Sequence, residues 1–258
     1  MQAEAVPRAG TFVLLGGHGA PVSERTVGPA GADCDAFVVE STAIDRPPAL
    51  PEIALHLASE VTPLWYATER WLAERGVPPP FWAFAWAGGQ GLARYVIDRP
   101  EVVRGKRVLD FACGGGCVAI AAAIAGAARV RAVDIDPLAV AACRRNAALN
   151  GVRVDVSGED LVGLPVEGVD VLLAGDIWYE RPAADRFAAW LREVAASGVR
   201  VIVGDPGRAY VPTDLAVLAV LPVATSIDLE GCEEREVRVL EVGARAATPG
   251  SAASIAGR

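Results

Sequence analysis

Residues 108–120, with the sequence VLDFACGGGCVAI, constrain the fold of this 258-residue chain more than any other stretch. An apolar run typical of a buried strand leads through Asp110 to three consecutive glycines, and a second apolar run follows directly. Glycines let a ligand approach the backbone, and a helix that begins after them presents free N–H groups. The stretch therefore predicts a strand, a tight turn and a helix, with the turn as a candidate ligand site.

Strand and helix patterns alternate along the chain, which predicts an α/β fold with a parallel sheet and helices on both faces. Two final strand patterns, at 214–231 and 233–242, predict a C-terminal antiparallel hairpin whose last strand lies at an edge of the sheet. The other predicted strands are 106–112, 128–135, 152–160, 168–177 and 199–207, and the predicted helices are 51–76, 89–100, 117–126, 137–151 and 181–198.

Composition divides the chain into three parts. Residues 1–50 are rich in Gly, Ala and Pro, which predicts a variable or partly disordered N-terminal extension. Residues 51–243 form the predicted folded domain, and residues 244–258 form a flexible tail. No apolar run approaches the ~20 residues that span a bilayer, and the N-terminal stretch lacks the basic segment of a signal peptide. We therefore expect a cytoplasmic protein that does not enter a membrane.

Charge and side-chain chemistry exclude several functional classes. The net charge of −8 argues against nucleic-acid binding, because such proteins carry a basic surface. The five cysteines are scattered without a Cys-x-x-Cys pair, so the sequence predicts neither disulfides nor a metal site. A hydrolase triad has no support either, because no G-x-S-x-G elbow is present. We expect a monomer.

Two nucleotide chemistries could explain the glycine turn. Asp134 stands 20 residues after Gly114, where a carboxylate can accept hydrogen bonds from ribose hydroxyls. Residues 114–119 also satisfy the G-x-G-x-x-A fingerprint of NAD or FAD, and a turn without a ligand is a third alternative. Asp110 would meet a like charge in a pyrophosphate. It suits instead a ligand with a free ammonium group, such as S-adenosylmethionine.

Several motifs resemble a known family. VLDFACGGG resembles motif I of the seven-strand S-adenosylmethionine-dependent methyltransferases, with Ala112 where the first glycine usually stands, and AVDIDP resembles their next, acidic motif. PEIALHL, PPFWAFAWAGGQG, GDIWYE and GDPGRAYVP extend the likeness over roughly residues 51–243. Together they resemble the electron-transfer flavoprotein β-subunit lysine methyltransferase family, whose relatives are often labelled nicotinamide N-methyltransferase-like. We expect the Ala112 departure to matter little, because Gly114 and Gly116 keep the turn.

The resemblance implies a Rossmann-like seven-stranded methyltransferase sheet and a set of site residues. In related enzymes the acid and aromatic residues of GDIWYE lie at the substrate entrance, where an acid orients the lysine ammonium and aromatic rings hold its stem by cation–π contact. The predicted cofactor-binding residues are Trp86, Asp110, Gly114, Gly116, Asp134 and Asp160. The predicted catalytic residues, at the substrate entrance, are Asp176, Trp178 and Tyr179.

Some of these residues have a simpler explanation as well. Trp178 could belong to the core, because large aromatic residues commonly end buried. The aromatic residues at 82, 84 and 86 alternate with a period of two, which is typical of a half-buried strand as well as of a substrate wall. Asp160 could be an exposed loop acid, and Arg208 could anchor a substrate or simply be solvated.

The sequence therefore predicts an enzyme that transfers methyl groups from S-adenosylmethionine to lysine side chains of a protein, with the electron-transfer flavoprotein β-subunit as the implied substrate. The alternative is a small-molecule N-methyltransferase for an amine or pyridine such as nicotinamide. An open rim at the sheet edge favours the first, and a lid formed by residues 1–80 favours the second. A dinucleotide-binding oxidoreductase and a non-catalytic, cofactor-binding partner protein remain as further classes.

Overall fold

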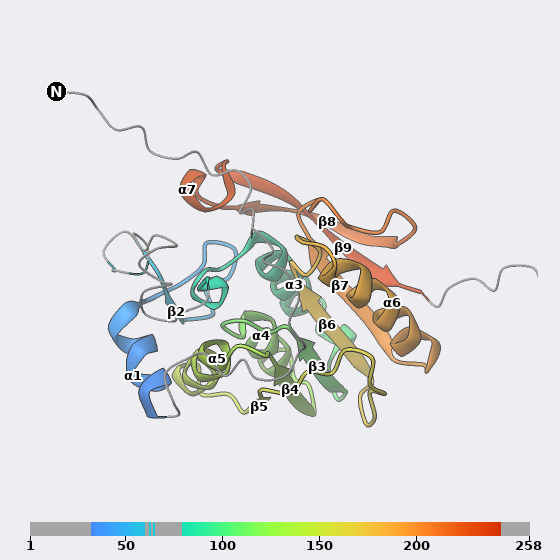
Figure 1. The fold of residues 1–258 in the computed structure, drawn as a ribbon, viewed down its shortest axis with the longest axis horizontal. Coiled ribbons are helices and arrows are strands. Elements are labelled where there is room, and N and C mark those ends of the chain that lie inside the picture. The colour runs from blue at the N-terminus through green and yellow to red at the C-terminus, as the bar shows by residue number, and fades with distance from the viewer. Residues whose placement is uncertain (1–31, 60–61, 63, 65–78, 244–258) are drawn as a thin grey trace, which may run out of the picture.

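The computed structural model describes residues 32–59, 62, 64 and 79–243 (Figure 1). Its centre is a seven-stranded sheet in the order β5-β4-β3-β6-β7-β9-β8. The strands from β5 to β7 are parallel, and β9 is antiparallel to both of its neighbours, so the predicted α/β fold with a C-terminal antiparallel hairpin is confirmed. The strands are β3 (Arg107–Phe111), β4 (Arg129–Val133), β5 (Asp155–Ser157), β6 (Val171–Gly175), β7 (Arg200–Asp205), β8 (Ala216–Ala224) and β9 (Glu234–Val242).

Helices cover both faces of the sheet, as predicted. Neighbouring residues of β6 point to opposite sides, so Leu173 packs in one core with α3 and α4 whereas Leu172 packs in another with α6. In Figure 1, α6 accordingly lies across β6 and β7 from α3. Strands that are buried on both faces require continuous apolar runs such as that of β6. The helices are α3 (Ala87–Asp98), α4 (Cys117–Ile124), α5 (Pro137–Leu149), α6 (Ala183–Ala196) and the short α7 (Ile227–Glu230).

The last strand of the chain is not at the edge of the sheet, so that expectation is wrong. The chain leaves β7 and first forms the outer strand β8, and then returns through α7 as β9, between β7 and β8. Val237 and Val239 of β9 are buried, whereas Glu236 and Arg238, which alternate with them, are exposed. The alternation therefore reflects one covered face of an inner strand rather than an edge position.

The helix after β4 begins where the sequence predicts it. Asp136 accepts a hydrogen bond from the N–H of Leu138 at 2.8 Å, and Pro137 occupies the first turn of α5. A side-chain acceptor before the helix and a proline inside its first turn are the usual start signals. The helix ends before Gly151, which has a φ of 65°.

Residues 51–59 do not form the predicted helix. They carry instead β2 (Leu55–Leu57), which pairs antiparallel with β1 (Ala43–Asp45). Side-chain amides of α5 hold this segment: Asn146 accepts from the N–H of His56 at 2.8 Å, and Asn150 accepts from the N–H of Ala54 at 2.9 Å. Most of the remainder of the predicted helix lies outside the described residues.

Residues 32–50 lie in the predicted N-terminal extension but carry regular structure, namely β1 and α1 (Ala32–Ser41). Val38 of α1 is buried in one cluster with Leu138 of α5 and Trp82. The weak apolar periodicity of this segment gave no sign of that packing. Residues 1–31 and 244–258 lie outside the described residues. Among the helices that the structure describes, none is long and apolar enough to cross a membrane.

Candidate active site

The glycine turn between β3 and α4 has no room for side chains. Gly114 and Gly116 have φ angles of 50° and 82°, in the left-handed region that favours glycine. A Cβ atom on Gly116 would lie 2.5 Å from Sγ of Cys143, and one on Gly115 would lie 2.9 Å from the carbonyl oxygen of Trp82. These glycines are therefore required by backbone conformation and by packing behind the turn, whether or not a ligand lies in front of it.

Two carboxylates hold the turn. Asp134, at the end of β4, accepts from the N–H of Gly114 at 2.9 Å with one oxygen and from the N–H of Asp136 at 3.0 Å with the other. Asp110 is 1% exposed and accepts from the N–H of Ala119 at 2.9 Å. Both acids therefore lie where the sequence predicts them, and Asp110 also binds the first turn of α4.

Both acids are held in an environment that disfavours their charge. Burial raises the pKa of Asp110 to about 8, the N–H of Ala119 opposes this rise, and the charge of Asp134 adds to it. Burial also raises the pKa of Asp134. A cationic group beside Asp110 would favour its ionised form. A cationic ligand would therefore ionise Asp110 and bind to it, whereas a pyrophosphate would disfavour the ionised form still further.

Two residues other than glycine adopt left-handed backbone at this edge of the sheet. Ala112 follows β3 with a φ of 53°, and Asp176 follows the neighbouring strand β6 with a φ of 55°. Such conformations cost of order 1–3 kcal/mol and concentrate at functional sites. The alanine at the family's glycine position is therefore a strained residue, and the expectation that this departure matters little is wrong for the backbone.

A cavity of about 70 Å³ lies between the turn and β6. A nucleoside-sized ligand needs a larger space, since small-molecule sites are typically about 300–1,000 Å³, so the side chains at the rim have to shift when one binds. The wall includes acids, the turn, apolar residues of β2 and aromatic residues, namely Asp110, Asp176, Gly114, Gly115, Leu55, Leu57, Phe81, Phe84 and Trp86.

Aromatic residues form the rim of this cavity. The ring of Phe81 lies 6.1 Å from that of Trp86 and 5.5 Å from that of Tyr179, which is half-exposed. Residues 81–83 form a 3-10 turn rather than a strand, so Trp82 points into the core while Trp86 stays at the rim. The half-buried-strand alternative is therefore wrong. Trp86 and Phe81 line the cavity, and Tyr179 contacts the ring of Phe81 without lining the cavity itself.

Asp176 lines the cavity, but both of its oxygens already have partners. One oxygen contacts Nη2 of Arg208 at 2.7 Å, and the other accepts from the N–H of Gly89 at 2.7 Å. Burial raises the pKa of Asp176 to about 6, although the charge of Arg208 opposes this rise. Arg208 is thus neither a free substrate anchor nor a solvated side chain, because it is the counter-ion of Asp176.

Trp178 is not at the substrate entrance, which corrects its predicted role. Its side chain is fully buried in the core beneath α6, with Leu191 and Ala184 of that helix. The chain turns sharply at Asp176, so the side chains of Trp178 and Tyr179 end in opposite environments, one in the core and one at the rim.

Asp160 is exposed on the loop after β5 and accepts from the N–H of Val162 at 3.0 Å. It does not line the 70 Å³ cavity. Its position agrees with that of an exposed loop acid, and its role toward a cofactor stays a prediction.

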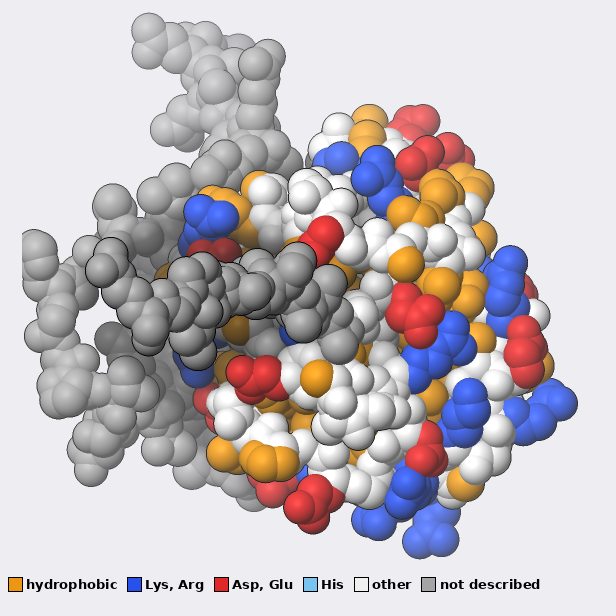
Figure 2. All heavy atoms as spheres, turned by 90° about the vertical axis from the view of Figure 1, so that its right-hand side faces the viewer, with side chains coloured by type: hydrophobic (Ala, Val, Ile, Leu, Met, Phe, Trp, Pro, Cys, Tyr) orange, Lys and Arg blue, Asp and Glu red, His pale blue; other side chains and the backbone are white. Residues whose placement is uncertain are grey.

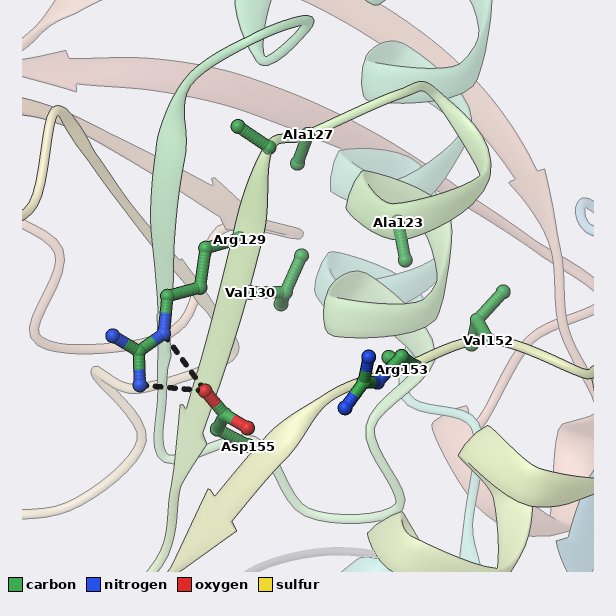
Figure 3. A pocket seen from close by; sticks show the side chains of 8 residues that line it. Ala123, Ala127, Arg129, Val130, Val152, Arg153 and Asp155 are labelled. Carbon is green, nitrogen blue, oxygen red and sulfur yellow. Dashed lines mark hydrogen bonds and ion pairs between the residues drawn. The ribbon is translucent and has the colours of Figure 1, made fainter.

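A larger cavity, of about 450 Å³, lies at the opposite end of the strands (Figure 3). Arg129 and Asp155, which line it, pair with each other at 2.8 Å, and both are more than half exposed. This cavity has no glycine turn and no buried acid, so we place the site at the smaller one. Within the described part of the chain, no group of three His, Cys, Asp or Glu side chains is placed to hold a metal ion.

Sequence reasoning missed two parts of the site. Glu230, from α7, is buried beside Arg208, and no sequence spacing connects the two residues. Gly88 and Gly89 begin α3 directly against Asp176. The glycine pair in the first turn of the helix is a usable signal, because consecutive glycines in a helix are unfavourable unless the backbone there must approach another element closely.

Comparisons with known proteins agree with this geometry. A family model described as "Ribosomal protein L11 methyltransferase (PrmA)" matches residues 95–177. The "Electron transfer flavoprotein beta subunit lysine methyltransferase" of Xenopus laevis is 38% identical over 191 residues, which are 73% of this chain and 76% of that protein. The human protein of the same name is 38% identical over 177 residues, which are 67% of this chain and 66% of that protein.

The likeness to these relatives covers most of the described chain. Relatives of the same name from Danio rerio and Mus musculus are 38% and 36% identical over 72% and 77% of this chain. The resemblance inferred from the motifs is thereby confirmed, and the chain belongs to the electron transfer flavoprotein beta subunit lysine methyltransferase family.

Proposed function

We propose that this protein transfers methyl groups from S-adenosylmethionine to lysine side chains of the electron-transfer flavoprotein β-subunit. One observation carries the proposal: relatives of that name are 36–38% identical over most of this chain. In agreement with it, Asp110, Gly114 and Asp176 of the matching motifs line one cavity.

The residues at the glycine turn fit S-adenosylmethionine. The turn between Gly114 and Gly116 would face the cofactor, Asp134 would bind its ribose hydroxyls, and Asp110 would bind its ammonium group. The cofactor supplies a methyl group on a positively charged sulfur, which is already activated for transfer. The buried Asp110 needs a cationic partner to ionise, and an ammonium group supplies one.

The rim of the cavity fits a lysine side chain. Methyl transfer requires a neutral amine, and deprotonating a lysine with a pKa of about 10.4 at pH 7 costs roughly 4.6 kcal/mol. The aromatic rings of Phe81, Trp86 and Tyr179 lower the polarity around the nitrogen, which favours the neutral amine, and they contact the aliphatic stem. The protein therefore aligns and desolvates the amine, and no nucleophile of its own is needed.

We further propose that the protein is a cytoplasmic monomer that binds no nucleic acid. None of the five cysteines, all of which lie among the described residues, forms a disulfide, as a reducing compartment favours. On the face in Figure 2, basic and acidic side chains lie interspersed, and pairs such as Arg200–Glu241 at 2.9 Å neutralise part of the basic charge. Light scattering and a nucleic-acid shift assay in low salt would test both properties.

The test is transfer of labelled methyl groups from S-adenosylmethionine to purified electron-transfer flavoprotein. We expect label on lysines of its β-subunit, located by mass spectrometry. Asp110→Asn should lose both transfer and cofactor binding, whereas Asp155→Asn, an exposed acid at the other end of the strands, should lose neither. Label found only in small molecules of a lysate would establish the amine methyltransferase instead. Cofactor binding without any transfer would favour a non-catalytic partner.

A further inference from the structure

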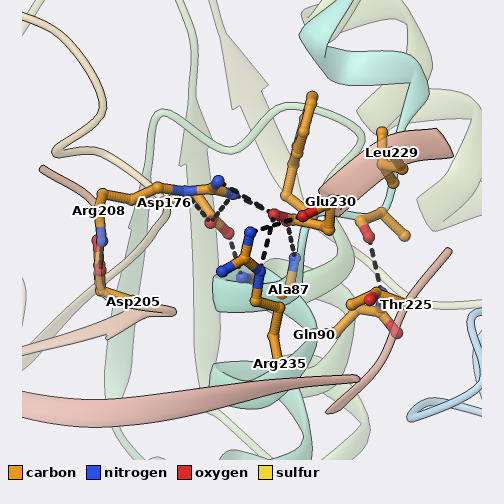
Figure 4. A network of polar contacts seen from close by, with 12 residues as sticks. Ala87, Gln90, Asp176, Asp205, Arg208, Thr225, Leu229, Glu230 and Arg235 are labelled. Carbon is orange, nitrogen blue, oxygen red and sulfur yellow. Dashed lines mark hydrogen bonds and ion pairs between the residues drawn. The ribbon is translucent and has the colours of Figure 1, made fainter. Parts of the chain in front are cut away.

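An ionic network next to the cavity joins two loops and a short helix that are distant in sequence (Figure 4). The guanidinium of Arg208, after β7, lies between Asp176, after β6, and Glu230 of α7. Nη2 of Arg208 is 2.7 Å from Oδ1 of Asp176 and 2.8 Å from Oε1 of Glu230. Nε adds a contact of 3.1 Å to the first acid, and Nη1 adds one of 3.1 Å to the second. Arg208 thus donates two hydrogen bonds to each acid. It binds both oxygens of Glu230, whereas both of its bonds to Asp176 go to Oδ1.

The same two acids hold the first turn of α3. Asp176 accepts from the N–H of Gly89 at 2.7 Å, and Glu230 accepts from the N–H of Ala87 at 3.2 Å. Helix N-termini favour negative charge, because their first N–H groups have no partner within the helix. The first turn of α3 follows Trp86, whose ring lies 5.6 Å from the Arg208 guanidinium carbon. The network therefore fixes a pocket acid and an aromatic residue of the rim together.

The side chains of the network are largely buried. The exposed fraction is 10% for the Asp176 side chain, 1% for Glu230 and 21% for Arg208. Removing the cation from such a site leaves two carboxylates close together at low dielectric, and one of them then takes up a proton. Arg235 lies 3.7 Å from Glu230 but has no contact with Asp176 in the described structure, so it cannot replace Arg208 there.

The other charged or titratable groups near Asp176 leave Arg208 as its cation. Asp205, at the end of β7, and Glu230 oppose the ionisation of Asp176. Cys117 of α4 also lies near Asp176, and burial keeps its thiol protonated by raising its pKa. Asp205 itself accepts from the backbone N–H groups of Gly207 and Arg208, each at 2.7 Å, and so fixes the loop that carries the arginine.

We propose that Arg208 and Glu230 are positioning residues that hold the Asp176 carboxylate in one orientation at the pocket and tie it to the first turn of α3. The expected change in kcat rests on the proposed function, whereas the expected change in the titration of Asp176 rests on the geometry alone. The GDPGR motif is then the support of a pocket acid rather than a substrate anchor.

Asp176 packs directly against the first turn of α3. A Cβ on Gly88 would lie 2.6 Å from its Oδ2 atom, so the carboxylate lies directly on the helix backbone. A side chain confined in this way loses its orientation when its cation is removed. Displacement of a group by about 1 Å at a reacting site lowers rates by up to roughly 100-fold.

The experiment compares Arg208→Ala, Arg208→Lys and Glu230→Gln with the wild type. The first measurement needs no activity: the carboxyl ¹³C resonance of Asp176, assigned with Asp176→Asn, is followed against pH. We expect the wild type to titrate near pH 6 and Arg208→Ala to titrate at higher pH, with Arg208→Lys between them. Arg107→Ala removes a similar bidentate pair, with Asp170, at the far end of the strands and should leave the resonance unchanged.

The second measurement is the pH profile of kcat for methylation of the flavoprotein subunit. Arg208→Ala should lower kcat by about 10- to 100-fold at pH 7 and move the acidic limb to higher pH, with partial rescue by Arg208→Lys. Glu230→Gln keeps an acceptor for Ala87 and should lower kcat less. An Arg208→Ala protein that folds, and in which Asp176 titrates as it does in the wild type, would overturn the proposal. A wild type that titrates as expected but transfers no methyl group would refute the proposed function alone.

Discussion

Substitution of Gly88 by alanine tests how closely α3 approaches the sheet. Gly88 and Gly89 of α3 face Gly175 of β6 and Gly204 of β7 without side chains between them. A Cβ on Gly88 would lie 2.5 Å from the carbonyl oxygen of Gly204 and 2.6 Å from Oδ2 of Asp176, roughly 1 Å closer than van der Waals contact. The carbonyl belongs to a central strand and cannot move aside, so α3 has to shift.

Two opposing terms decide the magnitude. Alanine is favoured over glycine in a helix by about 1 kcal/mol, whereas overpacking costs typically about 1–3 kcal/mol. We expect overpacking to prevail, with a net loss of about 1–2 kcal/mol in the free energy of unfolding, because the nearest atom belongs to backbone. Activity should fall as well, because the shift displaces Asp176.

The assay is urea unfolding together with the methylation rate, and Gly91→Ala is the matched control. A Cβ on Gly91 would lie 2.5 Å from a methyl group of Val237, and its three nearest atoms all belong to that valine rather than to a pocket acid. Gly91→Ala should therefore lose stability but retain kcat. A Gly88→Ala protein that is more stable than the wild type and fully active would refute the reasoning, since it would show that α3 has space at this position.

Three further predictions follow from the same site. Ala112→Gly should stabilise the protein by up to about 1 kcal/mol and so raise its unfolding temperature. It removes left-handed backbone strain of about 1–2 kcal/mol, but it also gives the unfolded chain more conformational entropy, which offsets part of the gain. A lower unfolding midpoint in calorimetry would contradict this. Asp110 binds a proton up to about pH 8 in the folded protein but only to about pH 4 when unfolded, so its contribution makes stability fall between these values. Asp110→Asn should flatten that fall in urea midpoints, and an unchanged slope argues against the raised pKa. Trp178→Phe should lose less stability than the roughly 3–5 kcal/mol of a truncation to alanine and leave KM for the protein substrate unchanged; a raised KM at unchanged stability would return Trp178 to the substrate wall.

Features that depend on neighbouring residues could be read from the sequence. Asp136 and Pro137 predict the start of α5 because a cap acts within one turn. The apolar run of β6 predicts a strand that is buried on both faces. Asp110 and Asp134 could be placed because each ends a strand beside the glycine turn, and strand ends of a parallel sheet meet at one edge.

Features that depend on a change of backbone direction could not be read from the sequence. At Asp176 the left-handed conformation ends the strand, so the two-residue period no longer tells on which side Trp178 lies. The same holds at residues 81–83, where a 3-10 turn replaces the alternation that a strand would show. The contact of Arg208 with Glu230 depends on the insertion of β9 between β7 and β8, which no local pattern encodes.

The structure also bears on Asp176, for which the resemblance implies a role in orienting the substrate. Its position at the pocket invites assignment as the base that accepts the lysine proton. A carboxyl with a pKa of about 6 is a poor acceptor from an ammonium with a pKa near 10.4, since the gap of about 4 units corresponds to about 6 kcal/mol. Both of its oxygens are also engaged, by Arg208 and by the N–H of Gly89. These observations argue against Asp176 as the base. We propose that Asp176 orients the substrate by its charge and that the proton leaves to water before the amine enters the aromatic rim.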